Sequence, residues 1–133
     1  MRVESLLLAG LAPLLAIVVL GVVLATSSGC TPSLPSGPPG ITGTVTSIVP
    51  GDGRPASLLV EGPRPQPQGA VSDKAHVSIP PATQFFGAQG GRATLAQVGA
   101  IAKGTKVRVW FEGAVAESYP VQGSAKAVQI LAP

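Results

Sequence analysis

The chain has 133 residues, a formal net charge of +3 and 11% charged residues, against about 25% in ordinary soluble domains. Gly and Pro contribute 17 and 14 residues, which indicates many turns and little long helix. Eight Lys and Arg residues follow Cys30 and are spread along the chain instead of forming a basic face, so we expect no nucleic acid partner.

The N-terminus has the layout of a secretory signal. Arg2 precedes an uncharged apolar run at residues 5–25, and small residues continue to Gly29. The run is also long enough to cross a bilayer as a helix, which takes about 20 residues. Two interpretations therefore stand for residues 1–29, a cleaved signal peptide or a transmembrane anchor, and both place the rest of the chain outside the cytoplasm.

Cys30 is the only cysteine and follows S-S-G at residues 27–29. This pattern resembles the lipobox of bacterial lipoproteins, in which the cysteine thiol is alkylated by diacylglycerol and the signal is cut just before it. A single cysteine cannot form an intramolecular disulfide. We therefore expect lipidated Cys30 to hold the protein at the cell membrane, with an uncleaved N-terminal helix as the alternative anchor.

Residues 30–40 continue from the lipid-attachment cysteine into the tract T-P-S-L-P-S-G-P-P-G. Proline favours an extended chain, at about 3 Å per residue, so ten such residues reach roughly 30 Å. We expect a tether that leads to an extracytoplasmic domain at residues 41–133.

Short apolar-alternating segments dominate that domain. Residues 50–53, P-G-D-G, form a turn signal between the first two, and residues 62–69 form a proline-rich loop. The clearest strand has Val107, Val109 and Phe111 on one face and Lys106, Arg108 and Trp110 on the other. The five predicted strands are residues 41–49, 57–61, 75–79, 105–112 and 125–131.

One short helix is expected at residues 94–101, where Thr94 and Gln97 have the spacing of a capping box. Gly99 limits it to one or two turns. Five strands with a small helix between the third and the fourth predict a mainly β fold, a small OB-like five-stranded partly open barrel that follows an N-terminal hydrophobic helix.

The C-terminal part carries a recognisable pattern. It comprises K-V-R-V-W at residues 106–110, Gly113, E-S-Y-P at residues 117–120, Gln122 and the strand at residues 125–130. This pattern resembles the signature of the YobA-like small lipoproteins of Gram-positive bacteria, a domain-of-unknown-function family. The opening I-T-G-T-V at residues 41–45 is similar to the start of the family. The resemblance implies a surface-anchored β-rich domain and no known reaction.

Candidates for catalysis are few. The only histidine, His76, falls on the outward face of a predicted strand, and Glu112 and Glu117 have no evident partner that would tune their pKa values. The sequence contains no nucleophile elbow, metal-ligand motif or phosphate-binding loop, and G-A-Q-G-G-R at residues 87–92 is expected to be a hairpin loop. We therefore predict no catalytic residue, metal or cofactor.

A candidate binding surface comprises Lys106, Arg108, Trp110, Glu117 and Tyr119. An aromatic ring flanked by cations can stack a sugar or a base, as in OB-folds. The favoured alternative is that Trp110 covers the end of the barrel or packs under the E-S-Y-P loop. Because Pro120 follows it, Tyr119 is expected in an extended loop, with its ring buried as a clasp between the fourth and fifth strands.

The sequence thus predicts a membrane-anchored extracytoplasmic protein with a non-enzymatic binding or interaction domain, whose partner is an envelope protein or a glycan. The alternative is an envelope-located enzyme or enzyme accessory that acts on glycan through Glu112 and Glu117.

Overall fold

The structure is a computed structural model that describes residues 32–66 and 69–133, of which Ser33–Pro133 form one compact unit. The predicted signal or anchor at residues 1–29, and Cys30 itself, lie outside the described residues. Within the described part of the chain, no helix is both long and apolar enough to span a membrane.

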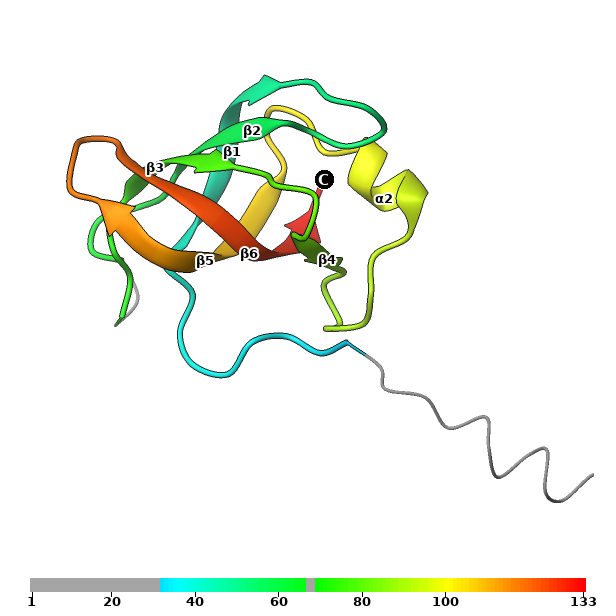
Figure 1. Ribbon diagram of the computed structural model, residues 1–133, viewed down its shortest axis with the longest axis horizontal. Coiled ribbons are helices and arrows are strands. Elements are labelled where there is room, and N and C mark those ends of the chain that lie inside the picture. The colour runs from blue at the N-terminus through cyan, green and yellow to red at the C-terminus, as the bar shows by residue number, and fades with distance from the viewer. Residues whose placement is uncertain (1–31, 67–68) are drawn as a thin grey trace, which may run out of the picture. The chain divides into compact units, whose positions relative to one another are not determined.

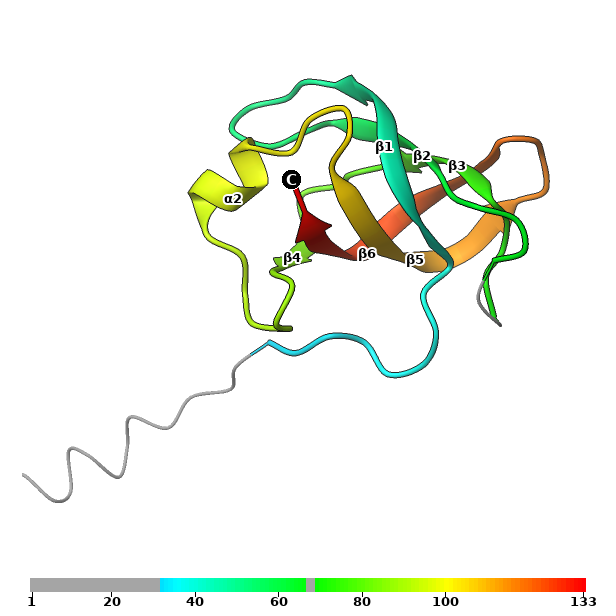
Figure 2. The same ribbon diagram turned by 180° about the vertical axis from the view of Figure 1, so that it is seen from behind.

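Six strands and one short helix make up the unit (Figures 1 and 2). All five predicted strands and the helix are present, and the last two strands are longer than expected. The sixth strand, β4, was not predicted, because three residues are too few to show a period. The elements are β1 (Ile41–Val49), β2 (Ser57–Glu61), β3 (Lys74–Ser78), β4 (Gln84–Phe86), α2 (Leu95–Gly99), β5 (Lys106–Ala116) and β6 (Val121–Ala132).

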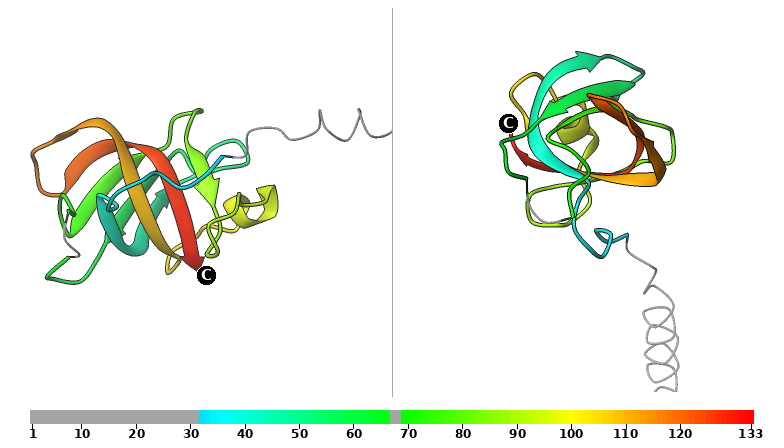
Figure 3. Two further views of the ribbon diagram at one scale, coloured as in Figure 1. Left: turned by 90° about the horizontal axis from the view of Figure 1, so that it is seen from below. Right: turned by 90° about the vertical axis from the view of Figure 1, so that its left-hand side faces the viewer.

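Five of the strands close into a barrel. The sheet runs β3-β2-β1-β5-β6, and a parallel pairing of β3 with β6 completes the ring, which the right-hand view of Figure 3 shows from one end. The predicted OB-like fold is confirmed, although the barrel is closed where a partly open one was expected. Strand β4 is an addition to this ring, and it pairs in parallel with β6.

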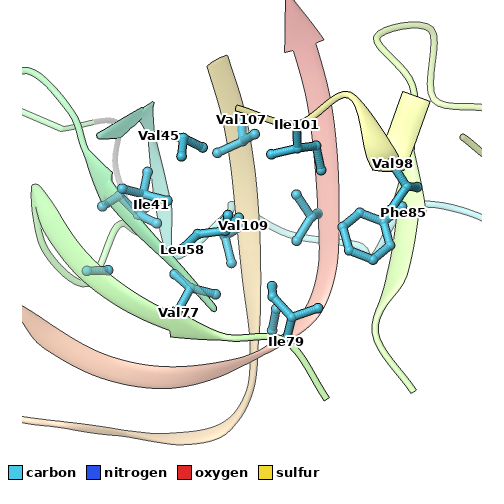
Figure 4. Packing of buried hydrophobic residues seen from close by; sticks show 14 of the residues in the cluster. Ile41, Val45, Leu58, Val77, Ile79, Phe85, Val98, Ile101, Val107 and Val109 are labelled. Atoms are coloured by element: carbon cyan, nitrogen blue, oxygen red, sulfur yellow. The ribbon is translucent and has the colours of Figure 1, made fainter. Parts of the chain in front are cut away.

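Alternating side chains fill the barrel (Figure 4). On β5, Val107 and Val109 are fully buried, and Val77 on β3 faces the same core. Phe85 from β4 and Val98 from α2 extend this core at one end of the barrel. Burial of these side chains is the main stabilising contribution, at about 1.5–3 kcal/mol each.

Gly43 lies where β1 passes close to the end of β2. A Cβ atom at this position would overlap the backbone carbonyl of Glu61, so only glycine fits without a backbone shift. The next residue, Thr44, pairs with Glu61 of β2 on one side and with Lys106 of β5 on the other. Strand β1 is therefore paired with both of its neighbouring strands at this point.

Residues 33–40, which we name the strap, lie on the barrel. Leu34 packs against a small cluster on the outside of the barrel, and the Gly40 N–H donates to the Val109 carbonyl at 2.8 Å. The Val71 N–H donates to the Gly40 carbonyl at 2.7 Å. In the left-hand view of Figure 3 the strap crosses β5 and β6. A leucine within the proline-rich tract supplies the apolar contact that a free spacer lacks.

Candidate functional site

A surface cleft lies at the end of the barrel that carries α2. It has a volume of about 400 Å³ and is bordered by the β1–β2 loop, the segment between β3 and β4, and α2. The β1–β2 loop is one of the loops with which OB-folds bind ligands. The charged, polar and large apolar side chains that line the cleft include those of Asp52, Arg54, Gln84, Phe85, Arg92 and Leu95.

Arg54 is held in a fixed position in this cleft. Its Nη2 donates to the Pro80 carbonyl at 2.6 Å and its Nη1 to the Pro81 carbonyl at 3.3 Å. The guanidinium also lies over the ring of Phe85, 5.0 Å from its centroid. A guanidinium has five N–H donors, so Arg54 keeps donors for a ligand while its orientation is already set.

Arg92 and Leu95 complete the rim. Arg92 is exposed and forms an isolated antiparallel bridge to Phe86. Leu95 is the first residue of α2 and is 88% exposed, an unusual state for a large apolar side chain. The cleft therefore combines one ordered cation, one exposed cation and one apolar group, which together suit a ligand with an anionic and an apolar part.

The helix that presents Leu95 forms for the predicted reason. The Thr94 hydroxyl accepts from the Gln97 N–H at 3.1 Å, and the Gln97 side chain accepts from the Thr94 N–H at 2.9 Å. This capping box fixes the start of α2, while Val98 anchors it to the core.

The predicted surface around Trp110 is arranged differently. Trp110 is only 9% exposed and packs with Phe86, Ala127 and Leu34. Its indole N–H donates to the Gly37 carbonyl at 3.2 Å. Trp110 is thus covered by the strap and not by the E-S-Y-P loop.

The two cations predicted beside Trp110 are exposed on β5. Lys106 is exposed, and Arg108 lies across from Gln129 of β6, with its Nη1 donating to Gln129 Oε1 at 3.4 Å. The buried Gln129 amide in turn donates to the carbonyls of Gly87 and Ala88, both at 3.3 Å. Arg108 therefore helps to order the loop after β4.

Tyr119 belongs to a second polar cluster, at the β5–β6 turn. Its ring is 62% exposed, so the expected buried clasp is wrong. The Tyr119 hydroxyl accepts from Arg64 Nη2 at 2.7 Å and donates to Asp73 Oδ2 at 3.4 Å, and the Arg64 guanidinium lies 5.5 Å from the ring centroid. Tyr119 thus joins the β5–β6 turn to the segment between β2 and β3.

Arg64 and Asp73 form an ion pair within that cluster. The hydrogen bond from Arg64 holds the pKa of Asp73 below its ordinary value, and the same contact raises the pKa of Arg64. Since Arg64 is largely exposed, with 69% of its side chain accessible, the pair is a surface contact that salt will weaken.

The two acids of the enzyme alternative are both exposed. Glu112 borders a cleft with Lys126 and Gln84, whereas Glu117 lies in the β5–β6 turn and lines none of the clefts described. His76 is exposed on β3, on the outward face that was predicted. Across residues 32–66 and 69–133, no three His, Cys, Asp or Glu side chains gather closely enough to hold a metal ion.

The second half of the chain matches a known protein family. A domain of the family described as "Protein of unknown function (DUF3221)" is found at residues 71–132, the segment that holds β3 to β6. No curated protein and no solved structure matches the chain. The K-V-R-V-W and E-S-Y-P motifs of the sequence resemblance both lie inside the matched range.

Sequence reasoning missed the cleft at α2, because its residues come from three separate segments of the chain. Arg54 directly follows the turn signal at residues 50–53, and nothing in the local sequence marks it as a site residue. Leu95 is three residues before the buried Val98, a spacing that predicts a shared inward face. Only the three-dimensional arrangement reveals that Leu95 is exposed beside two arginines.

Proposed function

We propose that this protein is a membrane-anchored extracytoplasmic lipoprotein that carries a non-enzymatic binding domain. Lipidated Cys30 would be its anchor, after removal of a signal peptide at residues 1–29. The lipobox-like S-S-G-C at residues 27–30 supports this anchor. We also propose that the chain is related to the YobA-like small lipoproteins, since the motifs of that resemblance fall within residues 71–132.

The observation that carries the proposal of a binding domain is the fixed guanidinium of Arg54 in the cleft beside Arg92 and Leu95. A preorganised donor loses little conformational freedom when a ligand arrives. An exposed leucine next to cations is typical of an interaction site, where an apolar contact is surrounded by polar groups. The partner we propose is an envelope protein or glycan that offers an anionic group to the two arginines.

The enzyme alternative receives less support. Hydrolysis of a glycan by two carboxyl groups requires both of them to flank one bond, at roughly 5–10 Å from each other. Glu112 borders a cleft and Glu117 borders none of those described. No observation on either side chain favours this function.

The test is affinity capture from envelope extracts with the full-length protein in detergent, followed by mass spectrometry. Leu95→Ser and Arg92→Ser should each remove the captured partner, because both side chains are exposed at the cleft. His76→Ala is the control, since His76 is exposed on the outer face of β3. A partner that both cleft variants retain would place the binding site elsewhere and overturn this assignment.

A further inference from the structure

The strap occupies a groove on the outside of the barrel. Leu34 packs against Phe86, Trp110 and Ala127, three side chains that are otherwise separate from the main core. Its Cδ1 also approaches Gly90 of the loop after β4, within 3.5 Å of where a Cβ would lie. The three partners come from β4, β5 and β6, so the Leu34 site is built by the barrel itself.

The groove continues along the strap beyond Leu34. A hollow of about 330 Å³ lies between Pro35 and Pro38 of the strap and Trp110, Phe111 and Lys126 of the barrel. The indole N–H of Trp110, which borders this hollow, donates to the Gly37 carbonyl. The Gly37 backbone has φ of 91°, a conformation that glycine adopts easily and that bends the strap there.

These contacts have the chemistry of peptide recognition. An aromatic-lined groove that packs proline, together with a side-chain N–H aimed at a peptide carbonyl, is a recurring way to bind extended proline-containing segments. The apolar site filled by Leu34 adds selectivity for one large aliphatic side chain. A segment of the chain itself shows which kind of ligand the groove accepts.

The first seven residues of the strap, 33–39, are held more loosely than its last residue, Gly40, and the strand β1 that follows. Among the described residues, the bond from Trp110 is the one hydrogen bond that joins residues 33–39 to the barrel. Gly40, by contrast, is fixed by Val109 on β5 and by Val71. Residues 33–39 can therefore leave the groove without breaking the pairing of β1, a local opening that costs less than global unfolding.

We propose that the groove around Trp110 is a binding site for an extended peptide of a partner protein that contains leucine and proline, and that residues 34–38 occupy this site in cis. The site is distinct from the cleft beside α2 and does not depend on the function assigned to that cleft. Binding in trans requires the strap to leave. If the strap is docked about 90% of the time, the apparent affinity for an external peptide is about tenfold weaker than the intrinsic one.

Trp110 makes the proposal testable, because it is the only tryptophan in the chain and its fluorescence reports on the groove alone. The full-length protein in detergent is compared with two variants that release the strap. Leu34→Ser removes the apolar contact, and Gly37→Val acts through the backbone, since φ of 91° is unfavourable for a β-branched residue. Ser33→Ala is the control, because Ser33 is exposed and precedes the docked residues 34–38.

Both release variants should shift the Trp110 emission to longer wavelength and make it more accessible to acrylamide, with the far-ultraviolet circular dichroism unchanged. The control should match the wild type. If both variants keep the emission and quenching of the wild type, the strap does not cover the groove and the proposal is wrong.

The second step adds the synthetic peptide S-L-P-S-G-P-P-G, the sequence of residues 33–40. It should reverse the emission shift of the Leu34→Ser protein and bind it about tenfold more tightly than the wild type. A peptide with serine in place of the leucine should bind much more weakly. If the released groove binds neither peptide, or binds both equally, the assigned ligand class is overturned.

Discussion

The hydroxyl of Thr83 donates a hydrogen bond to the carbonyl of Ala125 at 2.6 Å, and both residues are buried. Thr83 lies between β3 and β4, and Ala125 lies on β6, so this bond fastens the segment that borders the α2 cleft to the barrel. In a protein interior such a bond matters chiefly because its loss leaves a desolvated carbonyl without a partner.

Thr83→Val should therefore lower the free energy of unfolding by about 1–3 kcal/mol, since valine keeps the shape of threonine and removes the donor. Thr83→Ser, which keeps the hydroxyl, should lose less. Urea unfolding followed by circular dichroism measures both values. A Thr83→Val protein as stable as the wild type, with a loss only in Thr83→Ser, would show that the methyl group of Thr83, and not its hydrogen bond, is what stabilises this segment.

Two glycines of different surroundings offer a matched comparison. Gly43→Ala should destabilise the protein by about 1–3 kcal/mol, because the added methyl group meets the backbone of Glu61, which cannot move aside without shifting β2. Gly91→Ala adds the same methyl group where no atom lies within 4 Å. Thermal unfolding of the two variants should separate them clearly, and a Gly91→Ala loss as large as that of Gly43→Ala would contradict the steric explanation.

Much of the fold could be predicted because the barrel strands alternate cleanly. Val107 and Val109 on one face of β5, with Lys106 and Arg108 on the other, specify a strand with one buried side. The extra strand β4 escaped prediction because it has only three residues and pairs with β6, which is distant in sequence. Closure of the barrel depends on the parallel pairing of β3 with β6, which local pattern does not encode.

The sites were harder to predict, because their residues meet only in three dimensions. Trp110 was expected to cover the end of the barrel or to pack under the E-S-Y-P loop, but its cover comes from Leu34 and Gly37, far earlier in the chain. Tyr119 was expected to be buried between the fourth and fifth strands, but it is exposed. Its hydroxyl instead contacts Arg64 and Asp73, which come from the segment between β2 and β3. Sequence spacing identifies which residues share a strand face and not which distant segment lies over them.

The exposure of Tyr119 changes the stability effect that its replacement should have. A buried aromatic ring costs about 3–5 kcal/mol when it is replaced by alanine. With 62% of Tyr119 exposed, Tyr119→Ala should lose less, about 1–2 kcal/mol, because what it removes is chiefly the hydrogen bonds of the hydroxyl to Arg64 and Asp73. Tyr119→Phe, which removes the hydroxyl and keeps the ring, should lose nearly as much, and thermal melts of both variants test this. A loss of about 3 kcal/mol or more in Tyr119→Ala with none in Tyr119→Phe would mean that the ring packs against the barrel after all.

The ion pair of Arg64 with Asp73 should make a pH-dependent contribution. Because the pKa of Asp73 is lower in the folded protein than its ordinary value of 3.8, the folded state binds the proton less readily than the unfolded state. The stabilisation is thus complete above pH 3.8 and is lost as the pH falls through the lowered pKa of Asp73. Asp73→Asn removes the titrating charge with little change of shape. The difference in unfolding midpoint between wild type and variant should be small but measurable at neutral pH, and it should vanish in acid. A difference that persists unchanged in acid would mean that the effect does not come from the charge of Asp73.

The anchor can be tested by the mass of the mature N-terminus. If Cys30 is the lipid-attachment residue, the protein extracted from membranes should begin at position 30 and carry a diacylglyceryl group on its thiol. Two acyl chains hold a protein stably on a membrane, whereas one chain holds it only marginally.

Cys30→Ser removes the thiol to which the lipid would be attached. It should therefore prevent lipidation and cleavage and leave the apolar residues 5–25 attached. Ser28→Ala serves as the control, because it keeps a small residue two positions before the cysteine. A wild-type protein with an intact N-terminus and a free thiol would contradict lipidation and identify residues 5–25 as a transmembrane anchor.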